Sequence, residues 1–441
     1  MTVTKRIIIV GGGFAGVSVA QHIERSVPAD MEVVVISADN HLVFTPMLPE
    51  VVGRTISPLH VVVAGRELTR ETRWLEARIN HIDRDHHKVH YALANGEEAS
   101  MPYTHLVLAC GSRVNIAEIP GLADRGYALK TVMDAIALGN DLIGNFEAAS
   151  AESDPEVRRR LLSVVVIGGG FSGVEVAGHI ADLMRAVHRY YPELAKVPRK
   201  IHLLQKPDRI LPELNHKGLS EFALKKLRQN KIDVRLETTA KEVTPTAVEL
   251  ASGEVIDAGI VVCTIGTETQ PMIKGLGLAL EKGRLKTDPD MRVSETKNIW
   301  AIGDCAFVPN AYNNHPSPAT GQFALQQAMQ LAKNIRREIT GKSTVPFWFR
   351  PRGLLASIGH RNAVAEIYGL RLWGFPAWFL WRGVYLWKLP TLGRKFEVAI
   401  DWAWSLCFSP NIVQLRLKRS GSPEEDPTNE QQLKEYYENR S

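Results

Sequence analysis

The sequence is poor in features that identify several common classes of protein. Its 441 residues include only four cysteines, which lie far apart with neither a CxxC pair nor the spacing of a metal site. That pattern excludes a disulfide-stapled scaffold, and we predict no bound metal. We expect reduced and mostly buried thiols. The cysteines are Cys110, Cys263, Cys305 and Cys407.

An excess of one charge and an unusually apolar composition are also missing. The net charge of +5 is small for this length, so we expect no nucleic-acid partner, although attraction to anionic lipid is compatible with it. Apolar residues make up 45% and charged residues 23%, which is ordinary for a soluble globular protein. The N-terminus has no apolar core of a signal peptide, and we expect a reducing, cytoplasm-facing location.

A duplicated glycine motif organises the first two-thirds of the chain. Residues 6–16, RIIIVGGGFAG, and residues 163–175, SVVVIGGGFSGVE, each join a β-branched apolar run to G-x-G-x-x-G. This pattern predicts a strand, a tight turn and a helix start. A second glycine motif follows each copy about a hundred residues later, at Gly111 and Gly266. The glycines of the two primary motifs are Gly11, Gly13, Gly16, Gly168, Gly170 and Gly173.

Each motif predicts a backbone cradle for the pyrophosphate of a dinucleotide. One glycine makes the turn, the second lets the backbone approach the phosphates, and the third packs the helix on the strand. Free N–H groups at the helix N-terminus then favour the anion. One such motif is weak evidence, but two copies at matched spacing predict two bound dinucleotides.

The strand after each motif normally ends in a carboxylate that binds the ribose. The first copy has Ser37 there, with Asp39 two residues on as a substitute. The second has Gln205, followed by Lys206 and Arg209. A neutral side chain beside basic residues does not repel a 2′-phosphate, so both NADH and NADPH stay open as the second dinucleotide.

The motifs GGGFAG, IGGGFSGVE and NIWAIGDCA resemble those of the two-dinucleotide flavoproteins. The stretches at 41–57, 128–138 and 317–335, with a tryptophan-rich region behind them, are similar to type II NADH:quinone oxidoreductases. The resemblance runs from about residue 5 to about residue 415. It implies FAD in the first cradle, a nicotinamide dinucleotide in the second, and a quinone of the ubiquinone, menaquinone or plastoquinone type as acceptor.

The resemblance also implies roles for single residues. Asp304 would hold the FAD ribityl chain, and Pro46 lies in the matching stretch at 41–57. Glu175, in the first turn of the second cradle's helix, would face the nicotinamide or relay a proton, although a carboxylate that stabilises the helix N-terminus explains it too. The chain lacks the CxxxxC of disulfide reductases, and core packing explains Cys110, Cys263 and Cys305 better than the paired thiols of sulfide:quinone oxidoreductases.

A helix is predicted to begin near Pro318 and to aim its N-terminus at the flavin. The family motif AQxAxQ borders the quinone, and here the chain reads GQFALQQ, with Gly321 in place of the first alanine. Gln322 and Gln326 match the two glutamines and would bind quinone carbonyls. A solvated glutamine stripe is the alternative, and the glycine is expected to widen the pocket.

Six of the nine tryptophans fall within residues 373–404. The segment is broken by glycine, proline and arginine, so it is not expected to span a bilayer. Trp378, Trp381 and Tyr385 recur at helical spacing among Arg382, Lys388 and further basic residues, a pattern that suits a lipid headgroup boundary. A dimer interface or a cap on the flavin domain is the alternative. We therefore predict a peripheral, monotopic membrane protein on the cytoplasmic face, with a homodimer as a further partner state.

The predicted fold class is α/β, with two Rossmann-like domains and a C-terminal amphipathic, membrane-associating segment. Two functional alternatives remain: a soluble NAD(P)H-dependent reductase of a protein acceptor, and a non-catalytic flavin redox sensor. The predicted divisions are residues 1–118 and 291–342 for the FAD domain, 119–290 for the NAD(P)H domain, 343–419 for the membrane-associating region and 420–441 for a disordered tail.

Overall fold

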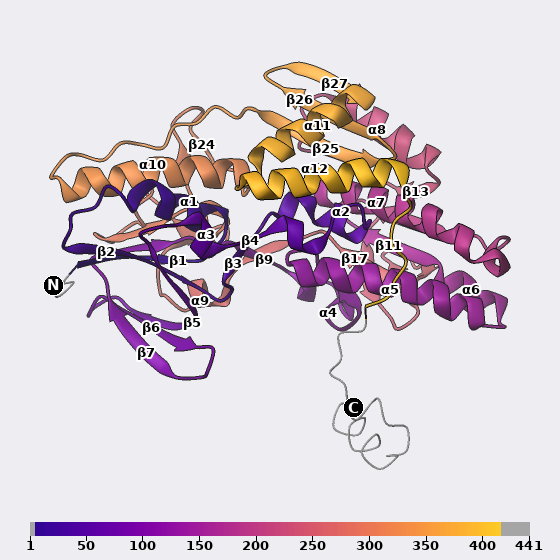
Figure 1. Cartoon of the computed structure of the whole chain (residues 1–441), viewed down its shortest axis with the longest axis horizontal. Helices are drawn as coiled ribbons and strands as arrows, with labels where there is room; N and C mark the ends of the chain where they lie inside the picture. The colour runs from indigo at the N-terminus through magenta and orange to yellow at the C-terminus, as the bar shows by residue number, and fades with distance from the viewer. Residues whose placement is uncertain (1–4, 416–441) are drawn as a thin grey trace, which may run out of the picture.

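The computed structural model describes residues 5–415. One half of the molecule, called the first half below, is built on a seven-stranded sheet that takes strands from both early and late parts of the chain (Figure 1). The strand order is β21-β8-β1-β2-β5-β6-β7; the pairs from β21 to β5 are parallel, and β5, β6 and β7 form an antiparallel extension. Helices α1 and α10 pack against each other on one face of this sheet. The elements are β1 (Lys5–Val10), α1 (Phe14–Ile23), β2 (Met31–Ser37), β5 (Arg73–Asp83), β6 (Lys88–Leu93), β7 (Glu98–Pro102), β8 (His105–Leu108), β21 (Ile299–Ala301) and α10 (Gly321–Ile339).

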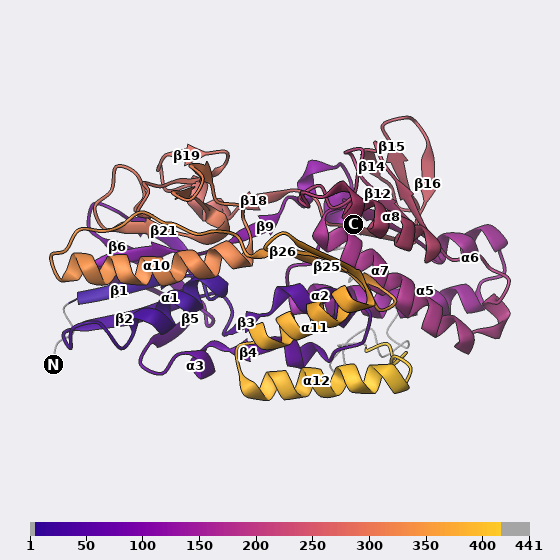
Figure 2. The same ribbon diagram turned by 90° about the horizontal axis from the view of Figure 1, so that it is seen from above.

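A five-stranded parallel sheet forms the second half, in the order β10-β17-β11-β12-β13. Strands β11 and β17 are fully buried and nearly continuous apolar runs, as expected where both faces of a sheet are covered. A three-stranded antiparallel sheet, β14-β15-β16, lies beside it (Figure 2). The elements are β10 (Gly126–Tyr127), α5 (Val132–Ala151), α6 (Pro155–Leu161), β11 (Ser163–Ile167), α7 (Phe171–Val187), β12 (Lys200–Leu204), α8 (Lys217–Gln229), β13 (Ile232–Arg235), β14 (Ala240–Val243), β15 (Ala247–Leu250), β16 (Val255–Asp257) and β17 (Ile260–Cys263).

Two antiparallel strands, β9 (Ser112–Val114) and β18 (Thr267–Thr269), carry the chain out of and back into the first half. The second sheet is therefore an insertion. Ile273 and Leu285 pack in the core of the first sheet, within the stretch 271–290 that was predicted to belong to the inserted domain. The returning elements are α9 (Pro271–Lys274), β19 (Leu280–Glu281), β20 (Arg284–Lys286), β22 (Ala306–Phe307), β23 (Pro309–Asn310) and β24 (His315–Pro316).

Short elements after β2 connect the first sheet to the inserted half. They include α2, which packs against α5 and α7, and η2, which packs against α12. The elements between β2 and β5 are β3 (His41–Val43), η1 (Thr45–Met47), α2 (Leu48–Val52), η2 (Pro58–Val61), β4 (Val62–Ala64) and α3 (Gly65–Leu68). The remaining short elements, elsewhere in the chain, are η3 (Ile116–Glu118), α4 (Leu122–Arg125), η4 (His188–Tyr190), η5 (Pro192–Leu194) and η6 (Gly303–Cys305).

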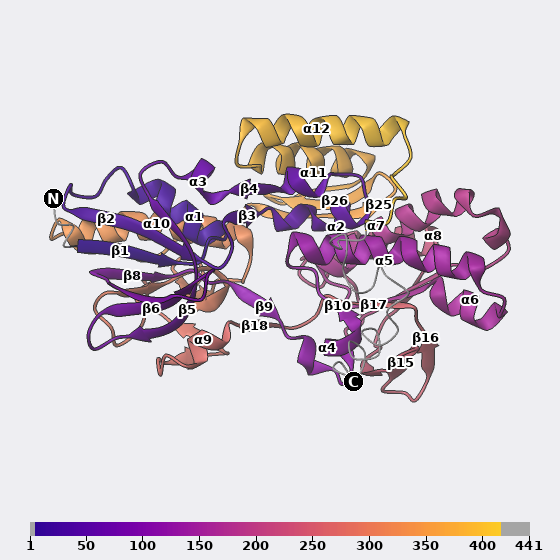
Figure 3. The ribbon, with the colours of Figure 1, turned by 60° about the horizontal axis from the view of Figure 1, so that its bottom comes forward.

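The C-terminal region is an antiparallel sheet followed by two helices. Strands β25 (Gly353–Gly359), β26 (Asn362–Ile367) and β27 (Leu370–Gly374) pack on α7 and α8, and α11 (Phe375–Lys388) packs on the sheet. Helix α12 (Leu392–Cys407) lies outermost (Figure 3). Within residues 5–415, no helix has the length and apolar character needed to cross a membrane. The predicted tail, 420–441, lies outside the described residues.

The predicted surface role of three aromatic positions on α11 needs correction. Trp378 and Trp381 are 9% and 1% exposed, because they pack into the protein together with Trp402 of α12. Arg382, expected among lipid headgroups, instead stacks on the rings of Trp378 and Trp402, at 4.0 and 4.7 Å. Tyr385 packs against Trp381 at 4.6 Å. Helical periodicity located this aromatic stripe, but it could not tell a protein neighbour from lipid.

Candidate dinucleotide and quinone sites

The first cradle has the geometry that a pyrophosphate requires. Gly11 has φ +110°, and a Cβ there would lie 2.5 Å from the Ala109 carbonyl oxygen. A Cβ on Gly16 would lie 1.9 Å from the Gly11 oxygen, so α1 approaches β1 as closely as only glycine allows. A Cβ on Gly13 would meet nothing within 4 Å. The backbone there is open to an incoming phosphate, and the residues fit a dinucleotide.

The second cradle repeats the backbone geometry of the first. Gly168 has φ +112°, and a Cβ on Gly173 would lie 1.7 Å from the Gly168 oxygen. The later glycines also match, since Gly111 and Gly266 both have φ +65°. At Gly170 a Cβ would lie 3.3 Å from the Glu213 carboxyl group, which has no counterpart at Gly13. The duplication in the sequence is therefore a duplication of structure.

The residues predicted to bind the riboses lie at the ends of β2 and just after β12. Ser37 ends β2 close to Gly12, whose added Cβ would meet its hydroxyl at 2.7 Å, and Asp39 is exposed. Gln205 is buried, and its amide is engaged with the protein: Oε1 accepts from the Gly169 N–H at 2.7 Å and Nε2 donates to the Arg209 carbonyl at 2.9 Å. Gln205 thus holds the glycine loop, a role that the sequence did not indicate.

Three segments converge where the flavin is expected. An added Cβ on Gly303 would lie 3.4 Å from Cβ of Ala15 in the first cradle and 3.7 Å from Cβ of Ala324 on α10. Asp304 accepts a hydrogen bond from the Ser112 hydroxyl at 3.0 Å, and Lys130 donates to the same hydroxyl at 3.3 Å. Asp304 therefore sits at the junction of both halves of the chain, where the family role for it was predicted.

The N-terminus of α10 lies beside the start of α1 in the first cradle. An added Cβ on Gly321 would lie 3.8 Å from the Phe14 ring, an ordinary contact. The side chain of Gln322 is tied to the segment before β25: it accepts from the Arg352 N–H at 2.9 Å and donates to the Gly353 carbonyl at 3.4 Å. Gln326 reaches only the Met329 sulfur, at 3.8 Å.

Gln327, one position beyond the predicted pair on α10, is 2% exposed and accepts from the Gly303 N–H at 2.8 Å. It fixes the loop that carries Asp304. The sequence placed Gln327 off the predicted glutamine stripe, and no local signal marks it as buried.

A buried carboxyl group occupies the position predicted to be catalytic. Glu175 is 7% exposed and accepts from the Ser357 N–H at 3.0 Å and from Trp381 Nε1 at 3.2 Å. Burial raises the pKa of Glu175 to about 8, and the charge of Glu50 adds to the rise. Such a group can hold and release a proton near neutral pH, which a glutamate that only caps a helix does not need to do.

Pro46 lies in η1, between the first cradle and the C-terminal helices. Its neighbour Phe44 contacts the ring of Phe14 at 5.7 Å and that of Tyr385 at 6.2 Å. These edge-to-face contacts join the start of α1 to α11. The expected quinone region is thus bordered by elements from both ends of the chain.

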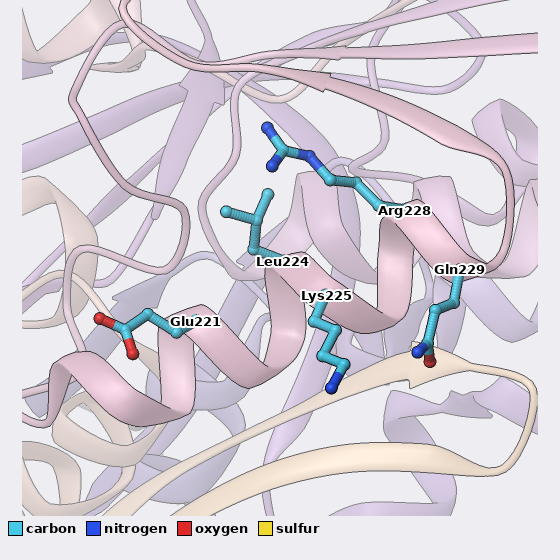
Figure 4. A pocket seen from close by; sticks show the side chains of 5 residues that line it. All are labelled: Glu221, Leu224, Lys225, Arg228 and Gln229. Carbon is cyan, nitrogen blue, oxygen red and sulfur yellow. The ribbon is translucent and has the colours of Figure 1, made fainter.

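The cysteines and one surface hollow are the further features that bear on the site. Cys263 and Cys305 are buried, Cys110 is half-buried and Cys407 is exposed, and all are free thiols. A surface hollow of about 480 Å³ lies on α8, lined by residues of that helix alone (Figure 4). It is remote from both cradles in sequence and lacks the apolar enclosure of a coenzyme site. Its lining residues are Glu221, Leu224, Lys225, Arg228 and Gln229.

Two matched cradles on parallel sheets, one inserted into the other, define the class of two-dinucleotide oxidoreductases. Residues 5–332 match the family of pyridine nucleotide-disulphide oxidoreductases, and residues 352–409 match the NDH2 C-terminal domain. A probable NADH dehydrogenase of Dictyostelium discoideum is 31% identical, over 92% of this chain and 91% of that protein. A demethylphylloquinone reductase of Synechocystis is also 31% identical, over 90% and 95%.

The solved structure of NDH2 from Plasmodium falciparum in complex with NADH has the same fold. The TM-score is 0.86 at 20% identity, over 93% of this chain and 99% of that one. The chain belongs to the type II NADH:quinone oxidoreductases, within the pyridine nucleotide-disulphide oxidoreductases. The predicted family, fold class and FAD-dependent NADH:quinone oxidoreductase activity are confirmed at this level.

Proposed function

We propose that this chain oxidises NAD(P)H at the second cradle and reduces a membrane quinone beside the first, without pumping protons. The matched cradles carry the proposal, since they provide two separate pyrophosphate sites whose later glycines also correspond. FAD, when bound in the first cradle, supplies the chemistry that accepts two electrons from a nicotinamide and passes them to a quinone. The protein contributes positioning and the exclusion of water.

The residue roles follow from the contacts in each cradle. Gly11, Gly13, Gly16, Gly111 and Asp304 would hold FAD, with Ser37 or Asp39 at its ribose. Gly168, Gly170, Gly173, Gly266 and the loop held by Gln205 would hold the nicotinamide dinucleotide. Gln322, Gln326 and Gly321 would border the quinone, and Glu175 would hold a proton for it.

We propose that the C-terminal helices dock on the membrane surface. Four large apolar side chains of α12 recur every fourth residue and are 61–73% exposed, while Val398 and Trp402 on the opposite face are buried. A quinone partitions into lipid, so its site must reach the bilayer surface, and an amphipathic helix of this kind does so without spanning it. The four are Leu392, Phe396, Ile400 and Trp404.

We propose a peripheral location on the cytoplasmic face of the membrane, where NADH would reach the second cradle. The same apolar face could instead pair with a second copy of the chain. A dimer is therefore the alternative occupant of this surface.

Steady-state oxidation tests the proposed function. NADH and NADPH are supplied in turn with ubiquinone, menaquinone and a plastoquinone analogue, with and without liposomes, and ferricyanide serves as a soluble acceptor. We expect turnover with at least one quinone and a higher rate with liposomes. Ferricyanide turnover without any quinone turnover would favour a soluble reductase of a protein acceptor. Turnover far below one per second with every acceptor would favour a redox sensor.

A further inference from the structure

A second buried carboxyl group lies behind Glu175. Glu50, on α2, is 2% exposed, and its Oε2 accepts from Trp402 Nε1 at 2.9 Å. Glu175 is bound in the same way by Trp381, and the two indole rings lie 6.3 Å apart. Each carboxyl group is therefore held by a tryptophan of a different C-terminal helix. A buried carboxyl group with so few partners is costly for stability, which calls for an explanation in function.

A third carboxyl group connects this cluster to the surface. Asp401 precedes Trp402 in α12 and is 21% exposed. Its Oδ2 lies 2.6 Å from Nδ1 of His60, whose side chain is 26% exposed, and accepts from the Ser57 N–H at 2.9 Å. The charge of Asp401 acts on Glu50, and that of Glu50 acts on Glu175. Acidic groups are thus arranged in series from the surface to the second cradle's helix.

The surrounding charges tune Glu50 to near-neutral pH. Burial raises its pKa to about 7, Arg382 and the Trp402 hydrogen bond lower it, and Asp401 raises it. On α7, burial lowers the pKa of His179 to about 4, so this ring is neutral. Arg382 itself remains charged, with its pKa lowered by burial to about 10. Burial raises the pKa of Tyr385, and the charge of Glu175 adds to the rise, so the phenol keeps its proton.

The reaction itself needs such a path. In the balanced equation, NADH + H⁺ + quinone gives NAD⁺ + quinol, so one proton per turnover must come from solvent. The other hydrogen of the quinol, with both electrons, originates in NADH. A buried quinone site therefore requires one inward proton route, and a group with a pKa near the working pH serves it best.

We propose that Glu50 is a positioning residue, an inference that rests on the proposed function. It holds this proton between the His60–Asp401 pair at the surface and Glu175. Among the described residues no hydrogen bond joins these carboxyl groups directly. Two buried nitrogen atoms of the same cluster, His179 Nε2 and Arg382 Nε, have no protein partner. Internal water is the usual partner of such atoms, and it supplies the steps between the carboxyl groups.

The test compares two acceptors in the FAD-loaded enzyme over pH 5.5–9.5 (a range on the order of two units either side of neutrality). Ferricyanide takes electrons without taking protons, so the ratio of quinone turnover to ferricyanide turnover isolates proton delivery. For the wild type we expect the ratio to fall as pH rises above the apparent pKa of the carboxyl pair. In Glu50→Gln we expect the ratio to fall by at least about tenfold, with any remaining limb set by Glu175 alone.

Two further variants shift the limb in opposite directions. Trp402→Phe removes a hydrogen bond that lowers the pKa of Glu50, so the limb should move to higher pH. Asp401→Asn removes a charge that raises this pKa, so the limb should move to lower pH. A structural defect would lower rates without this opposite pair of shifts. Both variants retain Glu50, so the proposal stays testable even if Glu50→Gln folds poorly.

The matched control is Glu24→Gln. Glu24 is also buried, at 8% exposure, but it lies at the C-terminal end of α1 and accepts from the backbone N–H groups of residues 70–72. We expect the wild-type ratio and limb in this variant. Infrared titration of the holoenzyme gives a readout independent of turnover. The protonated carboxyl absorption that titrates near neutrality should lose the Glu50 contribution in Glu50→Gln and keep that of Glu175.

Three results would overturn the role of Glu50. They are a wild-type ratio and limb in Glu50→Gln, an equal loss with both acceptors, or limbs that move the same way in Trp402→Phe and Asp401→Asn. If the wild type reduces ferricyanide but no quinone, the proposed function itself fails. This result concerns the wild type alone, so it is distinct from any failure of the Glu50 role in the variants.

Discussion

At the residue scale, the glycines of one cradle differ in what surrounds them, in line with the separate roles that the motif predicts. Gly16 is needed by the protein, since an added Cβ would lie 1.9 Å from the Gly11 oxygen, whereas Gly13 faces open space. Contact between helix and strand therefore requires glycine at position 16. At position 13 the requirement comes from the expected ligand. The motif predicts both roles, and the structure adds the distances that each one rests on.

We predict that Gly13→Ala and Gly16→Ala fail in different ways. Gly16→Ala should lose about 2 to 3 kcal/mol of stability, because overpacking forces α1 off β1. Gly13→Ala should fold normally but bind FAD weakly, because the methyl group occupies the approach of the pyrophosphate. Urea unfolding of the apoprotein measures the first effect, and flavin absorbance per polypeptide measures the second. Equal stability losses in the two variants would contradict this division.

The buried acids show where reading the sequence stops at this scale. Glu175 was found because it follows a recognisable glycine motif, and Gln327 and Glu50 were missed. Their importance comes from burial by elements far away in the chain, such as the indole of Trp402, which lies 352 residues from Glu50. No local pattern encodes a contact at that separation.

At the element scale, the β-strand and glycine-loop units were predictable because each is local. An apolar β-branched run followed by G-x-G-x-x-G specifies a strand, a turn and a helix within about fifteen residues. Which face of α11 is buried in the protein was not predictable, because a stripe of aromatic residues packs equally well on protein or on lipid. Trp378 and Trp381 are buried in the protein. In contrast, Phe375, Phe379 and Trp387 remain 58–73% exposed.

The loop after β12 gives a prediction about coenzyme choice. Glu in place of Gln205 would keep an acceptor for the Gly169 N–H but would set a negative charge beside the Arg209 carbonyl and the expected 2′-phosphate. We expect Gln205→Glu to lower kcat/KM for NADPH about tenfold more than for NADH, which corresponds to about 1.4 kcal/mol.

Initial rates with each coenzyme at fixed ionic strength measure this difference, since screening by salt weakens it. Gln229→Glu on α8 is the matched control, because it adds the same charge to the same domain away from the cradle. If Gln205→Glu weakens both coenzymes equally, its role is confined to shaping the loop.

At the scale of the whole molecule, both ends of the chain build the region around the expected quinone site. The segment 41–64 and helices α11 and α12 meet there, and the inserted domain contributes α7 from below (Figure 3). The Arg54 guanidinium extends this junction to the last described residues, donating to the Asn411 carbonyl at 3.1 Å and to the Val413 carbonyl. The long separations explain why two cradles could be predicted from the sequence while the contacts between these distant segments could not.

The exposed face of α12 gives a prediction for the intact protein on a membrane. Burying a Phe or Ile side chain contributes about 1.5 to 3 kcal/mol, so Phe396→Asp and Ile400→Asp should each lower binding to anionic liposomes about tenfold or more. Val255→Asp is the control, because that valine is 59% exposed on β16 in the inserted domain. Liposome flotation measures binding, ferricyanide turnover should stay unchanged, and sedimentation velocity follows the oligomer. Unchanged flotation together with conversion of a dimer to a monomer would assign this face to a second copy of the chain instead of lipid.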